Sequence, residues 1–285
     1  MVQAKWMAVN MFKMNENHEE INLIGTSIRP NMETFYRFAL MSGEGIGTAY
    51  EYFVKWGLLK NVIDSAKDPK HIFIWGLPEK YGLGLDFVLL AMIYRSSITI
   101  VDERHAIIDK FKIISDKIGH RPQIDISRIE NLSQLDAKSF LEKNHGEKYD
   151  LLLSCEVLQR LSEGDRANYF NQIGKIAKVS AIFVPNKDNV AHAKLSGLNT
   201  VSLCELQSYC SQTSNDILKS GYVDMPPFPP GLRRSEDAKN KALDSRVERF
   251  LMRILEKWEL IEKITPFKIK AHLSHIVYVF TESYI

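Results

Sequence analysis

Apolar positions recur with two different periods along the chain, and their alternation predicts its secondary structure. Five short, nearly continuous apolar segments have the length and the β-branched or aromatic content of buried strands; they cover 71–75, 97–101, 123–129, 149–154 and 181–184. Between them, apolar residues recur every three or four positions, as on the buried face of a helix; these stretches cover 85–93, 107–118, 136–144 and 169–176. Residues 70–185 therefore predict strands that alternate with helices.

This alternation predicts an α/β fold. Strands separated by helices pair in parallel, and the helices cover both faces of the sheet. Continuous apolar strands are typical of a sheet buried on both faces. Ligands of such folds bind at the carboxyl ends of the strands, which here are followed by residues 75–84, 102, 130–131, 154–156 and 185–186.

The sequence on either side departs from the alternation. Residues 32–66 have a helical pattern broken at 43–47, which predicts two helices. Residues 187–257 form an insert, with a capping-box sequence at Ser202–Glu205, a proline-rich run and a long amphipathic helix. Two strand-like segments follow, at 260–265 and 273–281, and we expect them to pair as an antiparallel hairpin.

We therefore expect a helical cover over residues 1–66 and an α/β domain over residues 67–285. The insert at 187–257 is expected to cover the substrate, because long insertions at the carboxyl edge of a sheet tend to be functional. Within it, Phe228 lies in a stiff proline-rich run and is a candidate substrate contact, as is Asn186 after the fifth strand.

Composition narrows the class of protein. Of the 285 residues, 37 are basic and 35 are acidic, a balance that gives no broad electrostatic footprint for nucleic acid. The three cysteines include no C-x-x-C pair, so we expect neither a disulfide framework nor a metal site. The longest apolar run, 87–94, is far shorter than the ~20 residues that span a bilayer. We expect a cytoplasmic protein with no membrane partner.

A glycine-rich turn follows the first strand and indicates a close approach of backbone to a ligand. It contains Gly76, Gly82 and Gly84, and Asp102 ends the next strand. An acid at that place can accept hydrogen bonds from both hydroxyls of a ribose. Dinucleotides and S-adenosylmethionine are both compatible with this arrangement. The dinucleotide fingerprint G-x-G-x-x-G and the Walker loop are absent, which disfavours the first class.

Residues 70–186 resemble a class I S-adenosylmethionine-dependent methyltransferase. The resemblance rests on the first strand with its glycine turn, the second strand ending in Asp102, the fourth-strand signature, the end of the fifth strand and the C-terminal hairpin; these are 72–84, 98–102, 149–161, 183–186 and 260–281. It implies a Rossmann-like, doubly wound, seven-stranded sheet, mostly parallel with an antiparallel C-terminal strand. It also implies S-adenosylmethionine as the cofactor.

The resemblance assigns cofactor contacts by position. The glycine turn would pass under the methionine part, Asp102 would hold the ribose, and the residues after the third strand would lie near the adenine. Ser154 and Cys155 would flank the sulfonium; the alternative for this pair is a helix cap and a buried small residue. The family's acid before the first glycine is replaced by Ile74, so Glu79 is a substitute candidate. The full set is Gly76, Glu79, Gly82, Gly84, Asp102, Glu103, Glu130, Asn131, Ser154 and Cys155.

The implied function is methyl transfer by in-line displacement to a small-molecule acceptor. The protein would align the reactants and, where needed, remove one proton; the candidate bases are His192, Glu156 and Tyr50. The Asp/Asn-Pro-Pro-aromatic motif is missing after the fourth strand, which disfavours nucleic-acid bases and glutamine amides as acceptors. A non-catalytic cofactor-binding regulatory module is an alternative, and a nicotinamide-dependent oxidoreductase is a weaker one. Self-association into a homodimer stays open.

Overall fold

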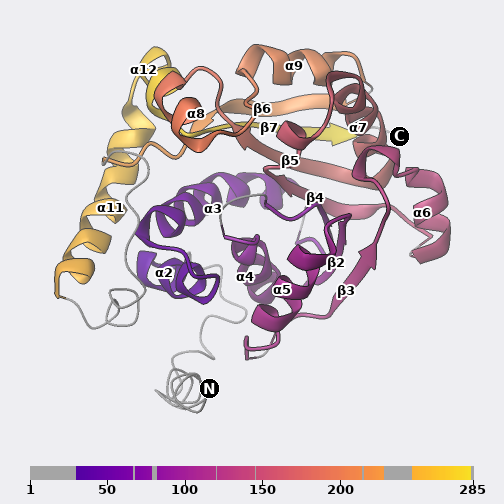
Figure 1. Ribbon diagram of the computed structural model, residues 1–285, viewed down its shortest axis with the longest axis horizontal. Coiled ribbons are helices and arrows are strands. Elements are labelled where there is room, and N and C mark those ends of the chain that lie inside the picture. Colours follow the sequence, from indigo (N-terminus) through magenta and orange to yellow (C-terminus); the bar gives the residue numbers. More distant parts are fainter. Residues whose placement is uncertain are drawn as a thin grey trace.

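A single seven-stranded sheet forms the centre of the molecule (Figure 1). The computed structural model describes residues 30–66, 68–78, 82–119, 121–144, 146–213, 215–227 and 246–283. The strands are β1 (His71–Trp75), β2 (Ser97–Asp102), β3 (Ile124–Arg128), β4 (Tyr149–Cys155), β5 (Ala177–Pro185), β6 (Asn215–Val223) and β7 (Ile276–Ser283).

Helices lie on both faces of the sheet. The α-helices are α2 (Met32–Met41), α3 (Ile46–Ala66), α4 (Leu85–Tyr94), α5 (His105–Ser115), α6 (Ala137–Asn144), α7 (Glu163–Ile176), α8 (Val190–Ser196), α9 (Leu203–Ser211), α11 (Arg246–Ile264) and α12 (Phe267–Leu273). The described residues also include two short 3-10 helices, η2 (Leu132–Gln134) and η3 (Leu158–Arg160). No helix of the described part is long and apolar enough to cross a bilayer.

The strand order is β3-β2-β1-β4-β5-β7-β6. Strands β1 to β5 pair in parallel, and β7 runs antiparallel to both β5 and β6. Ile276 at the start of β7 pairs with both Pro185 and Val223. The carboxyl ends of the parallel strands, the start of β7 and the end of β6 therefore lie along one edge of the sheet.

The core occupies both faces, as the continuous apolar strands predict. Along β1, Ile72 and Ile74 pack into the cluster formed with α2, α3, α4 and α11. Phe73 and Trp75 point to the opposite face and pack with α6, α7 and α9. All four side chains are fully buried. The predicted N-terminal helices, α2 and α3, share this core with the sheet.

The prediction for the hairpin is wrong in one strand. Residues 260–264 complete helix α11, residues 267–273 form α12, and the partner of β7 is β6, which lies inside the insert. The apolar residues Leu260, Ile261 and Ile264 continue the helical spacing rather than starting a strand. Strand β6 is an edge strand whose first half is largely exposed, so it lacks the apolar run that would reveal it.

Smaller boundaries also differ. Strand β5 begins at Ala177 rather than at residue 181, and α5 ends at Ser115 rather than running to residue 118. The predicted capping box is confirmed at the start of α9. The Ser202 hydroxyl accepts from the Glu205 amide at 3.2 Å, and the Glu205 carboxylate accepts from the Ser202 amide at 2.7 Å.

Candidate active site

The turn after β1 needs glycine at its first position. Gly76 has a φ of +77°, in the left-handed region, and its amide donates to the Val101 carbonyl at 2.8 Å. A Cβ at Gly76 would lie 2.7 Å from both the Arg160 guanidinium and the Val157 side chain. Both the backbone conformation and the close approach of these side chains therefore exclude larger residues.

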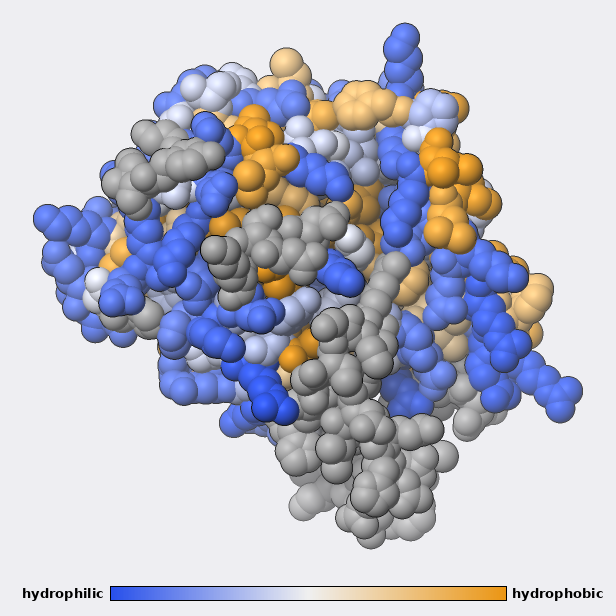
Figure 2. Space-filling model, turned by 180° about the vertical axis from the view of Figure 1, so that it is seen from behind, coloured by the Kyte–Doolittle hydropathy of each residue, from blue (hydrophilic) through white to orange (hydrophobic). Residues whose placement is uncertain are grey.

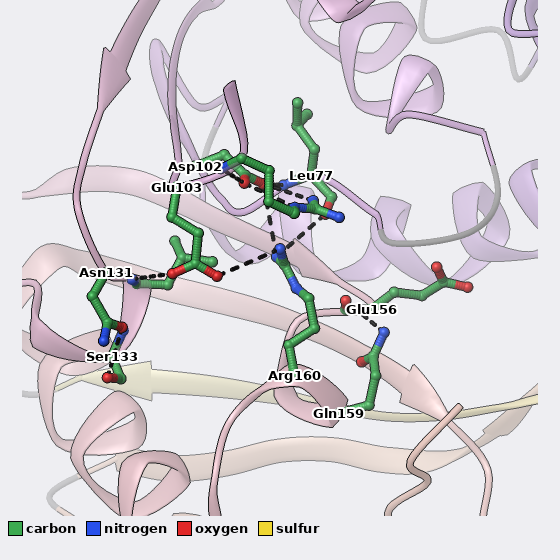
Figure 3. Close-up of polar contacts among 10 residues, drawn as sticks. Leu77, Asp102, Glu103, Asn131, Ser133, Glu156, Gln159 and Arg160 are labelled. Atoms are coloured by element: carbon green, nitrogen blue, oxygen red, sulfur yellow. Dashed lines mark hydrogen bonds and ion pairs between the residues drawn. The ribbon is translucent and has the colours of Figure 1, made fainter. Parts of the chain in front are cut away.

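Asp102 is buried at the end of β2, next to this turn (Figure 3). One carboxylate oxygen accepts from the backbone amide of Arg104 at 2.8 Å and from its Nε at 3.0 Å. The other oxygen accepts from the Leu77 amide at 2.7 Å and from Arg104 Nη2 at 2.8 Å. The carboxylate is thus surrounded by donors of the protein itself.

The pKa of Asp102 reflects these donors. Burial alone would raise it, because the charged form loses its hydration. Hydrogen bonds from Arg104 and the charges of Arg160 and Arg104 outweigh burial and hold the pKa of Asp102 below its usual value. Asp102 is therefore ionised at neutral pH.

Arg160, in η3 after β4, connects Asp102 to a second carboxylate. Its guanidinium lies 3.7 Å from Asp102 and 3.9 Å from Glu103, and it donates to the Leu77 carbonyl at 3.4 Å. Glu103 in turn accepts from the Leu132 amide at 2.9 Å. We call Asp102, Glu103, Arg104 and Arg160 the Asp102 network; it holds two acids and two cations.

The structure brings together only part of the predicted cofactor set. Asp102 and Glu103 belong to the Asp102 network, and Gly76 lies against its Arg160. Asn131 lies beside it, where its side-chain oxygen caps η2 by accepting from the Ser133 amide and hydroxyl, at 2.8 Å each. Glu130 is exposed to solvent.

The second half of the glycine turn packs against α3. Gly82 has a φ of +75°, and its carbonyl accepts from the Tyr52 hydroxyl at 2.5 Å. Gly84, also left-handed, caps the start of α4. The predicted contacts Glu79 and Phe228 lie outside the described residues.

Ser154 and Cys155, at the end of β4, face opposite sides of the sheet. The Ser154 hydroxyl accepts from the Tyr169 hydroxyl at 2.7 Å on the α7 side. The Cys155 thiol points to the α3 side, 3.6 Å from the Lys55 ammonium. Because they diverge, the pair does not present two side chains to one ligand atom, and Ser154 anchors α7.

Asn186, a predicted substrate contact, holds the chain together after β5. Its side-chain amide donates to the carbonyls of Ala271 and Ser274 at 2.8 and 2.9 Å. Its side-chain oxygen accepts from the Asp188 amide at 2.9 Å. The residue is fully buried, so its polar atoms fix the loop before β7.

A buried charged cluster on the α3 side is not predicted from the sequence. Lys55 of α3 lies 2.8 Å from Glu51 and 3.0 Å from Asp86, and its side chain is 1% exposed. With Cys155 these residues form what we call the Lys55 cluster. Burial raises the pKa of Glu51 to about 7, against the lowering effect of Lys55, and the charges of Asp224 and Glu156 add to the rise.

A histidine–aspartate pair lies nearby at the same edge. His275 Nδ1 is 2.9 Å from an Asp224 carboxylate oxygen, and the His275 amide donates to the Asp224 carbonyl at 2.7 Å. Burial lowers the pKa of His275, but the charges of Asp224, Glu51 and Glu262 outweigh burial and raise it. The predicted base His192 stacks on His275, with ring centroids 4.0 Å apart.

The other two predicted bases lie at the same edge. The Tyr50 hydroxyl donates to Glu262 at 2.6 Å, and burial followed by the Glu262 charge raises the pKa of Tyr50 far above its usual value. Glu156 is buried with a left-handed φ of +55°, and its carboxylate points away from Arg160 (Figure 3). The sequence gives no sign that Lys55, Asp224 and His275 lie close together. They belong to α3, the end of β6 and the start of β7, which are far apart along the chain and become neighbours only when it folds.

The residues present fit an adenosine-containing cofactor only after a rearrangement. Asp102 is an ionised acceptor at the carboxyl end of β2, and the Leu132 amide is a donor beside it. However, Arg104 and Glu103 now use these groups, and Arg160 fills the space over Gly76. Among the described residues, no group of His, Cys, Asp and Glu side chains is arranged to hold a metal ion.

The strand order with its reversed β7 defines the fold of the class I methyltransferases, as the sequence predicts. The chain is similar to the methyltransferase domain of bacterial CtHen1 (14% identity, 80% of this chain and 97% of that chain, TM-score 0.49). It is also similar to a SAM-dependent methyltransferase from Archaeoglobus fulgidus (11%, 80% and 92%, TM-score 0.47). A third similar structure is magnesium protoporphyrin IX methyltransferase from Synechocystis with bound SAM (8%, 97% and 97%, TM-score 0.44). No protein-family model and no curated protein sequence matches the chain.

Proposed function

We propose that this protein is an S-adenosylmethionine-dependent methyltransferase that acts on a small-molecule acceptor. The observation that carries the proposal is the ionised Asp102 at the end of β2, beside the left-handed Gly76 turn. In a sheet of this strand order, these two features meet at the edge where ligands bind. The similar structures that act in methyl transfer support the proposal.

The Asp102 network would open to admit the cofactor. Asp102 would exchange Arg104 for the two ribose hydroxyls, and the Leu132 amide would exchange Glu103 for an adenine nitrogen. The side chains of Arg104 and Glu103 are 23% and 27% exposed, so each can turn into solvent. Bound there, S-adenosylmethionine would supply a methyl group that its sulfonium already activates.

The acceptor would bind on the side of β5, β7 and β6. His275 is the base that we propose, because Asp224 orients its Nδ1 side and Nε2 remains to take a proton from the acceptor. Helix α11 closes this end of the sheet, since Glu262 accepts from Tyr50 of α3 and from the Asp224 amide at 2.9 Å. Such a covered edge favours a small acceptor over a macromolecule.

Replacement of Asp102 tests the proposal. Each hydrogen bond to a charged acceptor contributes ~1.5–3 kcal/mol, so Asp102→Ala should weaken S-adenosylmethionine binding by roughly ten-fold or more. Calorimetric titration measures this, with circular dichroism to verify the fold. Asp109→Ala is a matched control, because Asp109 forms only an exposed ion pair with Arg128. Equal affinities for the Asp102 variant and the wild type would contradict the proposal.

A second candidate is a regulatory module without catalysis, and the closed Asp102 network is the observation that favours it. If the two arginines stay in place, the Asp102 oxygens remain occupied and accept no hydrogen bonds from a ribose. Mass spectrometry of the small molecules released from the denatured protein tests which cofactor the protein binds: an S-adenosyl compound supports the proposed site, and a nicotinamide dinucleotide would support an oxidoreductase. Turnover of S-adenosylmethionine with an acceptor then separates the enzyme from a module that binds the cofactor without catalysis.

A further inference from the structure

Helix α11 separates its charges between two faces. It carries four glutamates, Glu248, Glu256, Glu259 and Glu262, and each is buried or half-buried. Glu248 accepts from the Tyr36 hydroxyl at 2.6 Å, Glu256 from the Met32 amide at 2.9 Å, and Glu262 from Tyr50. The acids of this helix therefore fasten it to α2 and α3.

The opposite face of α11, continued by α12, is basic and apolar. Its exposed cations are Arg246, Arg249, Arg253, Lys257, Lys263 and Lys268. Its exposed large apolar residues are Val247, Phe250, Ile254, Leu260, Ile261, Ile264, Phe267, Ile269 and Leu273. Between residues 246 and 273, all of which are described, no exposed residue is acidic. We call this surface the α11–α12 face.

The face gathers the exposed apolar residues of the molecule. It holds nine of the 14 large hydrophobic side chains that are exposed among the described residues. Phe250 is 62% exposed and Ile264 is 82% exposed. Figure 2 shows orange patches bordered by blue toward the edge where α11 and α12 lie. Large exposed apolar surface that is rimmed by charge marks an interaction site rather than an ordinary solvated face.

The composition of the face discriminates between partners. A second copy would bring one cation-rich face against another, and like charges would repel. A nucleic acid would match the cations but would leave nine large apolar side chains without a partner. An anionic bilayer offers both acidic headgroups and an apolar layer beneath them. At 1.5 Å per residue, the 19 residues of α11 span about 28 Å in the plane of such a surface.

We propose that the α11–α12 face binds the surface of anionic lipid bilayers, with both helices lying in the interface. The basic side chains contact lipid headgroups, and the apolar side chains enter the boundary with the acyl chains. This inference goes beyond methyl transfer and does not depend on it. The sequence analysis expects no membrane partner because the apolar runs are short. Short runs argue only against a segment that spans the bilayer, so the expectation is revised for a helix that lies on its surface.

Vesicle cosedimentation tests the inference with the full chain. The protein should bind vesicles of phosphatidylcholine and phosphatidylserine at 70:30 at least ten-fold more tightly than vesicles of phosphatidylcholine alone. Binding should weaken several-fold between 0.1 and 0.5 M NaCl, because salt screens the headgroup charges. Absence of binding to the anionic vesicles would overturn the inference.

Two surface variants localise the binding. Phe250→Ser with Ile264→Ser removes exposed apolar groups, and Arg249→Glu with Arg253→Glu reverses charge; each pair should reduce binding at least ten-fold. The control is Ile113→Ser on α5, which is equally exposed but lies outside the face. All these side chains are exposed, so the melting temperature should stay near that of the wild type. Unchanged vesicle binding in both double variants would overturn the assignment. A different outcome would assign the face to a second copy: the wild type does not bind lipid and is a dimer by light scattering, and the apolar variant is a monomer.

Discussion

The Asp102 network and the Lys55 cluster are both groups of buried charges at one edge of the sheet, yet they differ in access to water. In the Asp102 network, the Arg104 and Glu103 side chains are about one-quarter exposed. In the Lys55 cluster, the side chains of Lys55 and Asp86 are 1% and 3% exposed. The first group can exchange its partners for a ligand, whereas the second can do so only if α3 moves.

The difference assigns separate tasks to the two groups. A buried ion pair seldom adds net stability, but removal of one partner is costly because it leaves a buried charge without compensation. The Lys55 cluster therefore fixes α3 against β4 and α4. Under the proposed function, the Asp102 network would keep this edge charged and hydrogen-bonded until the cofactor replaces its arginine partners.

Loss of the buried ammonium should produce the largest effect. Lys55→Met leaves Glu51 and Asp86 without their cation and should reduce the free energy of unfolding by about 3–5 kcal/mol. Urea unfolding followed by circular dichroism measures the loss. Lys178→Met is the control, because Lys178 pairs with Asp150 at an exposed site where ion pairs contribute ~0–1 kcal/mol. Similar losses for both variants would show that the cluster is not sealed from water.

The pH dependence of stability should identify Glu51. Its folded pKa of about 7 lies above its ordinary value of 4.5, so its contribution is fully present below pH 4.5 and is lost as the pH rises through 7. Relative to Glu51→Gln, the wild type should lose stability progressively as the pH rises from 4.5 to 7.5. Urea unfolding across this range measures it, and the exposed Glu33→Gln is the control. Parallel pH curves for wild type and Glu51→Gln would refute a buried carboxyl.

A comparison of Gly76 with Gly43 measures how closely side chains pack around the turn after β1. Gly76→Ala and Gly43→Ala both force a side chain onto a left-handed residue, at a cost of ~1–2 kcal/mol. Only at Gly76 does the new Cβ meet neighbours, since nothing lies within 4 Å at Gly43. The Gly76 variant should lose about 1–2 kcal/mol more in thermal or urea unfolding. Equal losses would mean that Arg160 and Val157 move away freely.

Removal of Arg160 should change the affinity of the Asp102 site for its ligand. Its guanidinium covers Gly76 and pairs with both acids of the Asp102 network. Arg160→Ala should therefore tighten binding of S-adenosylhomocysteine by about three- to ten-fold, a gain of roughly 1 kcal/mol. Calorimetry measures the change, with Arg166→Ala on α7 as the control. Weaker binding in the Arg160 variant would mean that this arginine holds the ligand instead of competing with it.

The sequence predicts the sheet and one part of the site for the same reason. Buried parallel strands must be apolar, and Gly76 and Asp102 follow two of them directly, so local patterns are sufficient. Strand β6 is not predicted, because its exposed half lacks a continuous apolar run. Residues 260–264 are predicted as a strand but are helical, because their apolar spacing continues that of α11. Local patterns cannot show which side chains meet across the fold.

The contacts that local patterns do not predict join residues that are far apart along the chain. Lys55 meets Asp86 and Cys155 through the packing of α3 on the sheet. His275 meets Asp224 because β7 begins where β6 ends, a pairing that depends on the strand order. The sequence makes Asp102 a candidate site residue, but its arginine partners depend on side-chain directions that periodicity does not encode.

Calorimetric titration of the wild-type protein with S-adenosylhomocysteine tests the proposed cofactor site. We expect one site per chain, with affinity lowered at least ten-fold by Asp102→Ala and raised by Arg160→Ala. The contradicting result is no binding by the wild type and none by the Arg104→Ala/Arg160→Ala double variant, in protein shown by circular dichroism to be folded. That result would mean that the Asp102 network is a permanent structural element of a methyltransferase fold without its cofactor.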